Sequence, residues 1–184
     1  MIWYSRPVLK GVLDDERRPN DNSGVTFTNR SRIEGNSGME ILPGSTAQRS
    51  KTITKDDIQR FADLTGDHNP VHLDEQFAGT TRFKRPIAHG MLVASQVSSV
   101  LANELPGPGS IYLSQTLKFI APVYPGDTVT ATVTVIALRE DKPVLTLETI
   151  CTNQLGQRVV SGEAVVLLQI TETEQSNDRA TPVS

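Results

Sequence analysis

The chain has 184 residues, enough for one domain with its own core, and 37% of them are hydrophobic and 21% charged, as in globular proteins. A formal net charge of −3 without a dense basic run gives no electrostatic basis for nucleic-acid binding. The single cysteine, Cys151, excludes an internal disulfide and a cysteine-based metal site, and no apolar run reaches the roughly 18 residues of a membrane span. With no secretory-type apolar segment near the N-terminus, we expect a cytoplasmic protein.

The first 39 residues differ from the rest of the chain. The stretch DDERRPNDNSGVTFTNRSRIEGNSG is polar and has no hydrophobic period, so we expect residues 1–39 to form a disordered extension. Its acidic residues argue against a transit peptide. A further hypothesis is that the native chain starts at Met39. Residues 171–184 read as a disordered tail, which leaves residues 40–170 as the folded domain.

A first helix is predicted after residue 54. Thr54 and Asp57, three positions apart, form a capping box in its acidic version. Gly66 is placed to end the helix. Its apolar side is expected to consist of Ile58, Phe61, Ala62 and Leu64.

Two more helical segments follow. The Asn69-Pro70 step predicts a turn, because a residue before proline avoids the helical region, and a short helical piece follows around DEQFAGT. Residues 90–105, GMLVASQVSSVLANEL, are apolar on most sides with small residues interspersed. This composition predicts a helix buried in a core.

The second half of the chain predicts strands. In residues 128–135, TVTATVTV, threonines alternate with apolar residues, the period of a strand with one buried face. Its predicted neighbours are SIYLSQTLKFI, VLTLETICTN and RVVSGEAVVLLQI, separated by the turn segments APVYPGD, REDKP and QLGQ. Helices followed by an antiparallel meander predict an α+β fold in which the sheet wraps the apolar helix.

All three histidines lie close together, two in GDHNPVH at residues 66–72 and the third, His89, in RPIAHGM. His68 and His72 are four apart, which would place two metal ligands on one face of a helix. Pro70 lies between them and interrupts such a helix, so no metal site is predicted.

Two other interpretations of this segment remain. Asp67 and Asn69 are turn-forming residues, with His72 bonded to a backbone carbonyl. Alternatively, Asp67 and His72 converge across the rigid turn and hold a water molecule for addition to an electrophile, since histidine titrates near neutral pH.

The segment FADLTGDHNPVHLDEQFAGTTRFKRPIAHGMLVAS resembles the hydratase-2 motif of MaoC-like proteins, which include the (R)-specific enoyl-CoA hydratases that supply polyhydroxyalkanoate synthesis. The resemblance continues through LPGPGSIYLSQTLKFIAPVYPGDTVTATVTVIALREDKPVLTLET and SGEAVV and covers residues 40–168. It implies a hot dog fold, with the apolar helix enclosed by the antiparallel sheet. It also implies a homodimer joined through sheet edges, an acyl-CoA thioester substrate bound near the interface, and no cofactor.

The resemblance assigns the catalytic pair to Asp67 and His72, which would hold water for addition across the double bond of a trans-2-enoyl-CoA. The addition produces an enolate-like thioester, whose developing oxyanion needs a donor. Gly90 is expected to supply its backbone N–H, since unpaired amides and the helix dipole favour negative charge at a helix N-terminus.

Further roles are expected for residues around this pair. Ser98 matches a family serine that hydrogen-bonds the catalytic aspartate, although a core serine bonded to its own helix fits equally well. Asn69 is expected to shape the loop and His89 to support it. Leu101 and Val166 are expected to line the acyl pocket. Two interpretations are open for Arg82, Lys84 and Arg85, which either help to hold the CoA arm or form a solvated face.

Three rival functions are considered. The nearest is a 3-hydroxyacyl-[acyl carrier protein] dehydratase, with the same chemistry on another carrier. A hot dog thioesterase would use a carboxylate on the apolar helix, but that helix has no acid before Glu104, near its far end. A non-catalytic acyl-thioester binding module would have no need for both Asp67 and His72.

Overall fold

The computed structural model describes residues 33–34, 40–139 and 141–168. Apart from residues 33–34, the predicted extension lies outside the described residues, and so does the predicted tail. The strands are β1 Ile33–Glu34, β2 Glu40–Ile41, β3 Thr46–Thr52, β4 Ile111–Phe119, β5 Thr128–Leu138, β6 Val144–Thr152 and β7 Arg158–Leu167. The helices are α1 Lys55–Thr65, α2 Pro70–Leu73, α3 Glu75–Thr80 and α4 Gly90–Asn103.

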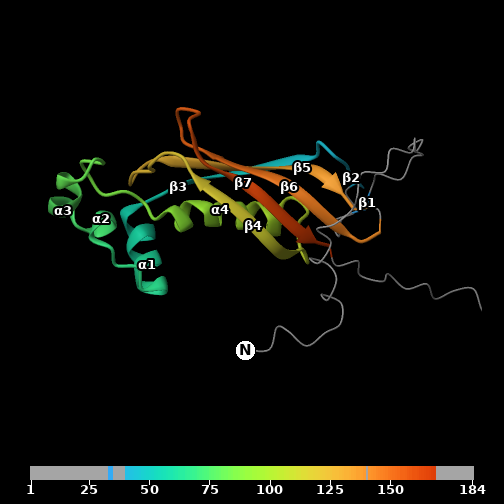
Figure 1. The fold of residues 1–184 in the computed structure, drawn as a ribbon, viewed down its shortest axis with the longest axis horizontal. Coiled ribbons are helices and arrows are strands. Elements are labelled where there is room, and N and C mark those ends of the chain that lie inside the picture. The colour runs from blue at the N-terminus through green and yellow to red at the C-terminus, as the bar shows by residue number, and fades with distance from the viewer. Residues whose placement is uncertain (1–32, 35–39, 140, 169–184) are drawn as a thin grey trace, which may run out of the picture.

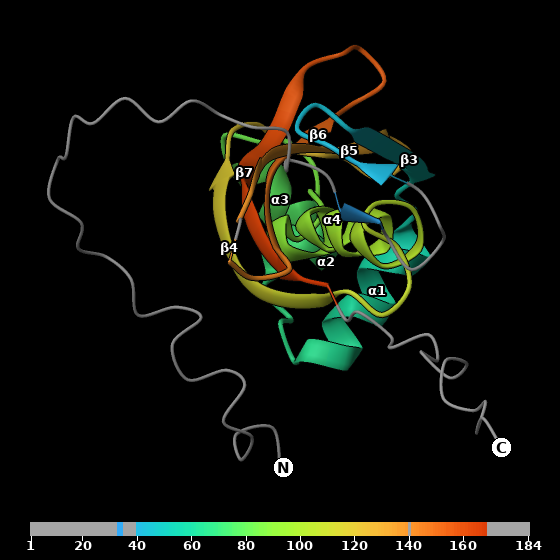
Figure 2. The same ribbon diagram turned by 90° about the vertical axis from the view of Figure 1, so that its right-hand side faces the viewer.

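A five-stranded antiparallel sheet in the order β3-β5-β6-β7-β4 wraps around helix α4 (Figures 1 and 2). Helices α1, α2 and α3 gather at one end of this sheet, and β1 and β2 form a separate two-stranded sheet (Figure 1). The predicted α+β hot dog architecture, with its central apolar helix, is confirmed. None of the described helices combines the length and apolarity needed to cross a membrane.

The core lies between α4 and the sheet. Helix α4 contacts β3, β5, β6 and β7, and its buried residues are Leu92, Val93, Ala94, Val97, Val100 and Leu101. In β5 every second residue is buried, as the period of two predicted, namely Val129, Ala131, Val133 and Val135. Each fully buried valine or leucine among them contributes roughly 1.5–3 kcal/mol, so this interface stabilises the fold.

Strand β3 was missed by the sequence analysis, which placed the helices before all strands. Its sequence, TAQRSKT, is almost wholly exposed and has no apolar alternation. The strand exists because it pairs along its length with β5, reinforced by hydroxyl contacts such as Ser50 to Thr130 at 2.8 Å and Thr52 to Thr128 at 2.9 Å. An edge strand held by a partner leaves little trace in its own sequence.

The simple meander was also wrong in part. Strands β5, β6 and β7 do follow one another, but β4 pairs with β7, so it lies at the edge opposite β3 and not beside β5. The segment between β4 and β5 must therefore pass from one side of the sheet to the other. The strands at the two edges, β3 and β4, both precede the meander in the chain.

Two helices are less buried than predicted. The capping box of α1 is confirmed, with Thr54 as N-cap and Gly66 in the left-handed conformation at φ 78°, but Leu64 is 84% exposed and does not belong to the apolar side. Helix α4 exposes one stripe along its length, made by Met91, Ser95, Ser98 and Ala102. The spacing of these four residues places them on one face of the helix.

Candidate active site

The loop after α1 is fixed by short-range hydrogen bonds. Gly66 turns the chain out of the helix, and the Asn69 N–H donates to Asp67 Oδ1 at 3.3 Å. Asn69 in turn caps α2, its Oδ1 accepting from the Val71 N–H at 3.2 Å, while Pro70 takes the first helical position, where no N–H is needed. The turn interpretation and the catalytic interpretation are therefore compatible, since the turn sets the positions of Asp67 and His72.

The imidazole of His72 is fixed by the backbone of a second segment. Its Nδ1 lies 2.8 Å from the carbonyl oxygen of Ile87, and because a carbonyl only accepts, Nδ1 carries the proton. Burial lowers the pKa of His72 below its usual 6.5, although the hydrogen bond to Ile87 and the charge of Asp67 act in the opposite direction. A neutral His72 in this tautomer offers a free lone pair at Nε2, the form needed to accept a proton from water.

His89 connects the two candidate catalytic residues. It is 1% exposed, and its Nε2 donates to the backbone carbonyl of Asp67 at 3.0 Å. Its ring lies against the ring of His72, with 3.9 Å between centroids, and 5.0 Å from that of Phe61. Its Nδ1 has no hydrogen-bond partner among the described residues. Since His89 is also the N-cap of α4, one buried ring joins the Asp67 loop, His72 and the start of the central helix.

Asp67, His72 and His89 each present one ligand-capable atom, and these atoms lie within 4.8 Å of one another. A water that accepts and donates hydrogen bonds of about 2.8 Å fits between the Asp67 carboxylate and His72. His68 is exposed and precedes α2, so it shares no helix face with His72.

A cavity of about 340 Å³ opens beside these residues. Asp67, His72 and Gly90 border it together, and its apolar wall includes Val93, Phe119, Ile120, Val123, Val159 and Val160. Gly90 is the first residue of α4, so its N–H has no acceptor within the helix. A Cβ at Gly90 would lie 2.8 Å from the ring of Phe119, so glycine allows this close approach. An acyl chain suits the apolar wall, and a thioester carbonyl suits the Gly90 amide.

Four other predicted site residues, Asn69 among them, do not border this cavity. Ser98 is on the exposed stripe of α4 and does not border the cavity, and no hydrogen bond joins it to Asp67 among the described residues. Leu101 and Val166 are buried in the core and do not border the cavity. Phe119, Val159 and Val160 were not predicted as cavity residues. Strand alternation identifies inward positions but not which of them face a cavity.

Comparisons with known proteins identify the family of this chain. The model of the MaoC like domain matches residues 42–153. A curated (R)-specific enoyl-CoA hydratase of Aeromonas caviae is 52% identical over 132 residues, 72% of this chain and 98% of that protein. The one from Rhodospirillum rubrum is 52% identical over 70% of this chain and 89% of its own length. The solved structure of the (R)-hydratase from A. caviae involved in PHA biosynthesis matches with a TM-score of 0.69 and 53% identity, over 70% of this chain and 98% of that one. The chain therefore belongs to the MaoC-like family.

Proposed function

We propose that the protein catalyses the (R)-specific hydration of trans-2-enoyl-CoA to (R)-3-hydroxyacyl-CoA, together with the reverse dehydration. The observation that carries the proposal is the convergence of Asp67, His72 and Gly90 on one largely apolar cavity. Two curated relatives that are 52% identical carry the name of this enzyme, which supports both the reaction and its stereochemistry.

The proposed mechanism gives each of the three groups a role. Asp67 and the Nε2 of neutral His72 accept the two hydrogens of one water molecule and orient its oxygen toward the β-carbon. As the C–O bond forms, the water loses one proton to this pair and the electrons of the double bond move toward the thioester oxygen, which accepts from the Gly90 N–H. The pair then returns a proton to the α-carbon, so that H and OH have been added across the bond.

The test is hydration of crotonyl-CoA by the purified full chain, followed by loss of the enoyl-thioester absorbance and chiral analysis of the product. Asp67→Asn and His72→Ala should each lower kcat by about 10²-fold or more, the usual contribution of an acid–base group. His68→Ala is the matched control, because it removes an exposed imidazole from the same loop and should retain the wild-type rate. Near-wild-type turnover by either catalytic variant would show that the mechanism is wrong.

The same assay separates the rival activities. A carrier-protein dehydratase would turn over crotonyl-acyl carrier protein much faster than crotonyl-CoA. A thioesterase would release the free CoA thiol, and its carboxylate would have to be Glu104, which follows α4 as an exposed C-cap and does not border the cavity. A binding module would retain the thioester unchanged.

We include in the proposal a homodimer joined through β4. This edge strand carries exposed apolar residues, with Phe119 and the following Ile120 each 55% exposed, whereas β3 at the other edge is polar and contains Arg49 and Lys51. Charged residues protect an edge from pairing, and exposed apolar residues do not. The exposed stripe of α4, which includes Ser98, would then face the second subunit.

We also place the protein in the cytoplasm. Its one cysteine, Cys151, is buried and free, and burial raises the pKa of its thiol to about 11. A chain that uses no disulfide is typical of a reducing compartment.

A further inference from the structure

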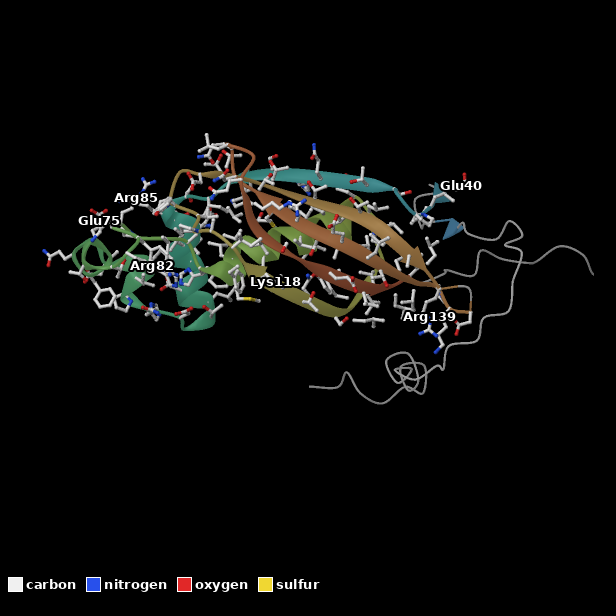
Figure 3. All side chains as sticks on the ribbon, turned by 45° about the horizontal axis from the view of Figure 1, so that its top comes forward. Glu40, Glu75, Arg82, Arg85, Lys118 and Arg139 are labelled. Carbon is white, nitrogen blue, oxygen red and sulfur yellow. The ribbon has the colours of Figure 1, made fainter. Side chains whose placement is uncertain are left out.

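Three basic residues lie within four positions of one another beside the cavity. Arg82, Lys84 and Arg85 are all exposed, and Arg82 borders the cavity directly. Figure 3 shows Arg82 and Arg85 at the end of the molecule that carries helices α1–α3, far from Glu40 and Arg139 at the other end. A concentrated positive charge therefore lies beside the cavity that is proposed to take the acyl thioester.

Carboxylates of the described residues do not neutralise this charge. No ion pair links any of the three residues to an acidic side chain of the described residues, not even Arg82 to Asp67, which borders the same cavity. The acids closest along the chain are engaged elsewhere, since Asp74 caps α3 and Glu75 pairs with Lys55 at 2.7 Å.

Asp127, in the loop beside residues 82–85, is also engaged elsewhere. Both carboxylate oxygens of Asp127 accept from neutral donors, the Tyr124 N–H and the Gln154 side chain, each at 2.8 Å. A cluster of cations without protein counter-ions is available to an anionic ligand.

Aromatic rings hold the two arginines in place. The Arg85 guanidinium lies 3.9 Å from the centre of the Tyr124 ring, and that of Arg82 lies 4.8 Å from the Phe83 ring. The Tyr124 hydroxyl also donates to the Phe83 carbonyl at 3.3 Å, so one tyrosine fixes both the backbone of the segment and the plane of Arg85. Guanidinium groups positioned in this way lose less freedom on binding phosphate than free side chains do, and their planar fork matches phosphate oxygens.

We propose that Arg82 and Arg85, with Lys84 beside them, bind the phosphates of the 3′-phospho-ADP end of CoA while the pantetheine arm enters the cavity. The inference rests on the proposed function, because it assumes a thioester substrate in that cavity. The segment would thus determine the choice of CoA as the acyl carrier.

The experiment compares the binding of CoA and of pantetheine to the full chain by calorimetry, which needs no turnover. Wild-type protein should bind CoA about tenfold more tightly or better, because only CoA carries phosphates. Arg82→Gln and Arg85→Gln should each weaken CoA binding by about fivefold and leave pantetheine unchanged, while Arg82→Lys should restore part of the loss. Arg49→Gln is the matched control, since this exposed arginine lies on β3 at the other sheet edge.

Several outcomes would overturn the proposal. Equal affinities of the wild type for CoA and pantetheine, or arginine variants that bind CoA normally, would show that the phosphates are not bound here. Variants that weaken only the binding of acyl-acyl carrier protein would assign the segment to a protein partner instead. If crotonyl-CoA is not hydrated but CoA binding depends on Arg82 and Arg85, the hydratase proposal fails and the phosphate site stands.

Discussion

The two imidazoles of the site differ in what their surroundings leave free. His72 is fixed through Nδ1 by the Ile87 carbonyl, and burial lowers its pKa and so favours the neutral ring. Its Nε2 therefore carries a lone pair that can accept a proton. His89 is fixed through Nε2 by the Asp67 carbonyl, and its other nitrogen is buried with no hydrogen-bond partner in the described part of the chain. One ring is suited to accept protons, and the other to hold the first in position.

The lowered pKa of His72 predicts the pH dependence of the enzyme. Because burial disfavours the imidazolium, the neutral base persists below pH 6.5, and the acid limb of kcat/KM for crotonyl-CoA should fall below that value.

The free energy of unfolding should also depend on pH in this range. The unfolded chain binds this proton near its usual pKa and the folded chain only at lower pH, so stability decreases as pH falls through that window. Rate profiles and urea titrations from pH 5 to 8 test both, and an acid limb above 6.5 would contradict the assignment.

Helix α4 serves both the core and the site, and glycine at its start is what allows both. The Phe119 ring of β4 occupies the space in which a larger residue at position 90 would place its side chain. Because Phe119 lies on the cavity wall, a side chain at position 90 would displace its ring and change the space proposed for the substrate.

Gly90→Ala should therefore fold but catalyse poorly. We expect kcat/KM for crotonyl-CoA to fall by about tenfold or more, with a melting temperature close to that of the wild type, because a displaced Phe119 blocks the approach to the amide. The double variant Gly90→Ala/Phe119→Leu should recover part of the activity, since leucine leaves room for the added methyl group. No difference between the single and double variants would show that Phe119 is not the obstacle.

Elements with a local signal could be predicted from the sequence, and elements defined by a partner could not. The capping box at Thr54 and the alternation in β5 depend on residues close together in the sequence, and both are confirmed. Strand β3 depends on hydrogen bonds to β5, some eighty positions away, and so it was missed. For the site, the short loop brings Asp67 and His72 together as expected, whereas the positions of Ser98 and Leu101 depend on how far along α4 the cavity extends.

The complete molecule is expected to be a dimer. Sedimentation velocity should give twice the mass of one chain, and dilution should not release monomer readily, because the exposed apolar residues of β4 and the stripe of α4 would be buried together. A monomer at micromolar concentration with full hydratase activity would show that a second subunit is not needed.

The anchors of the two histidines are main-chain oxygens, those of Ile87 and Asp67. Every amino acid supplies such an oxygen, so replacement of the Ile87 side chain changes packing but does not remove the acceptor. Substitutions at Ile87 therefore leave the hydrogen bond that orients His72 in place. The side chains that face the substrate can therefore change, and with them the range of acyl groups accepted, while the orientation of the catalytic pair is kept.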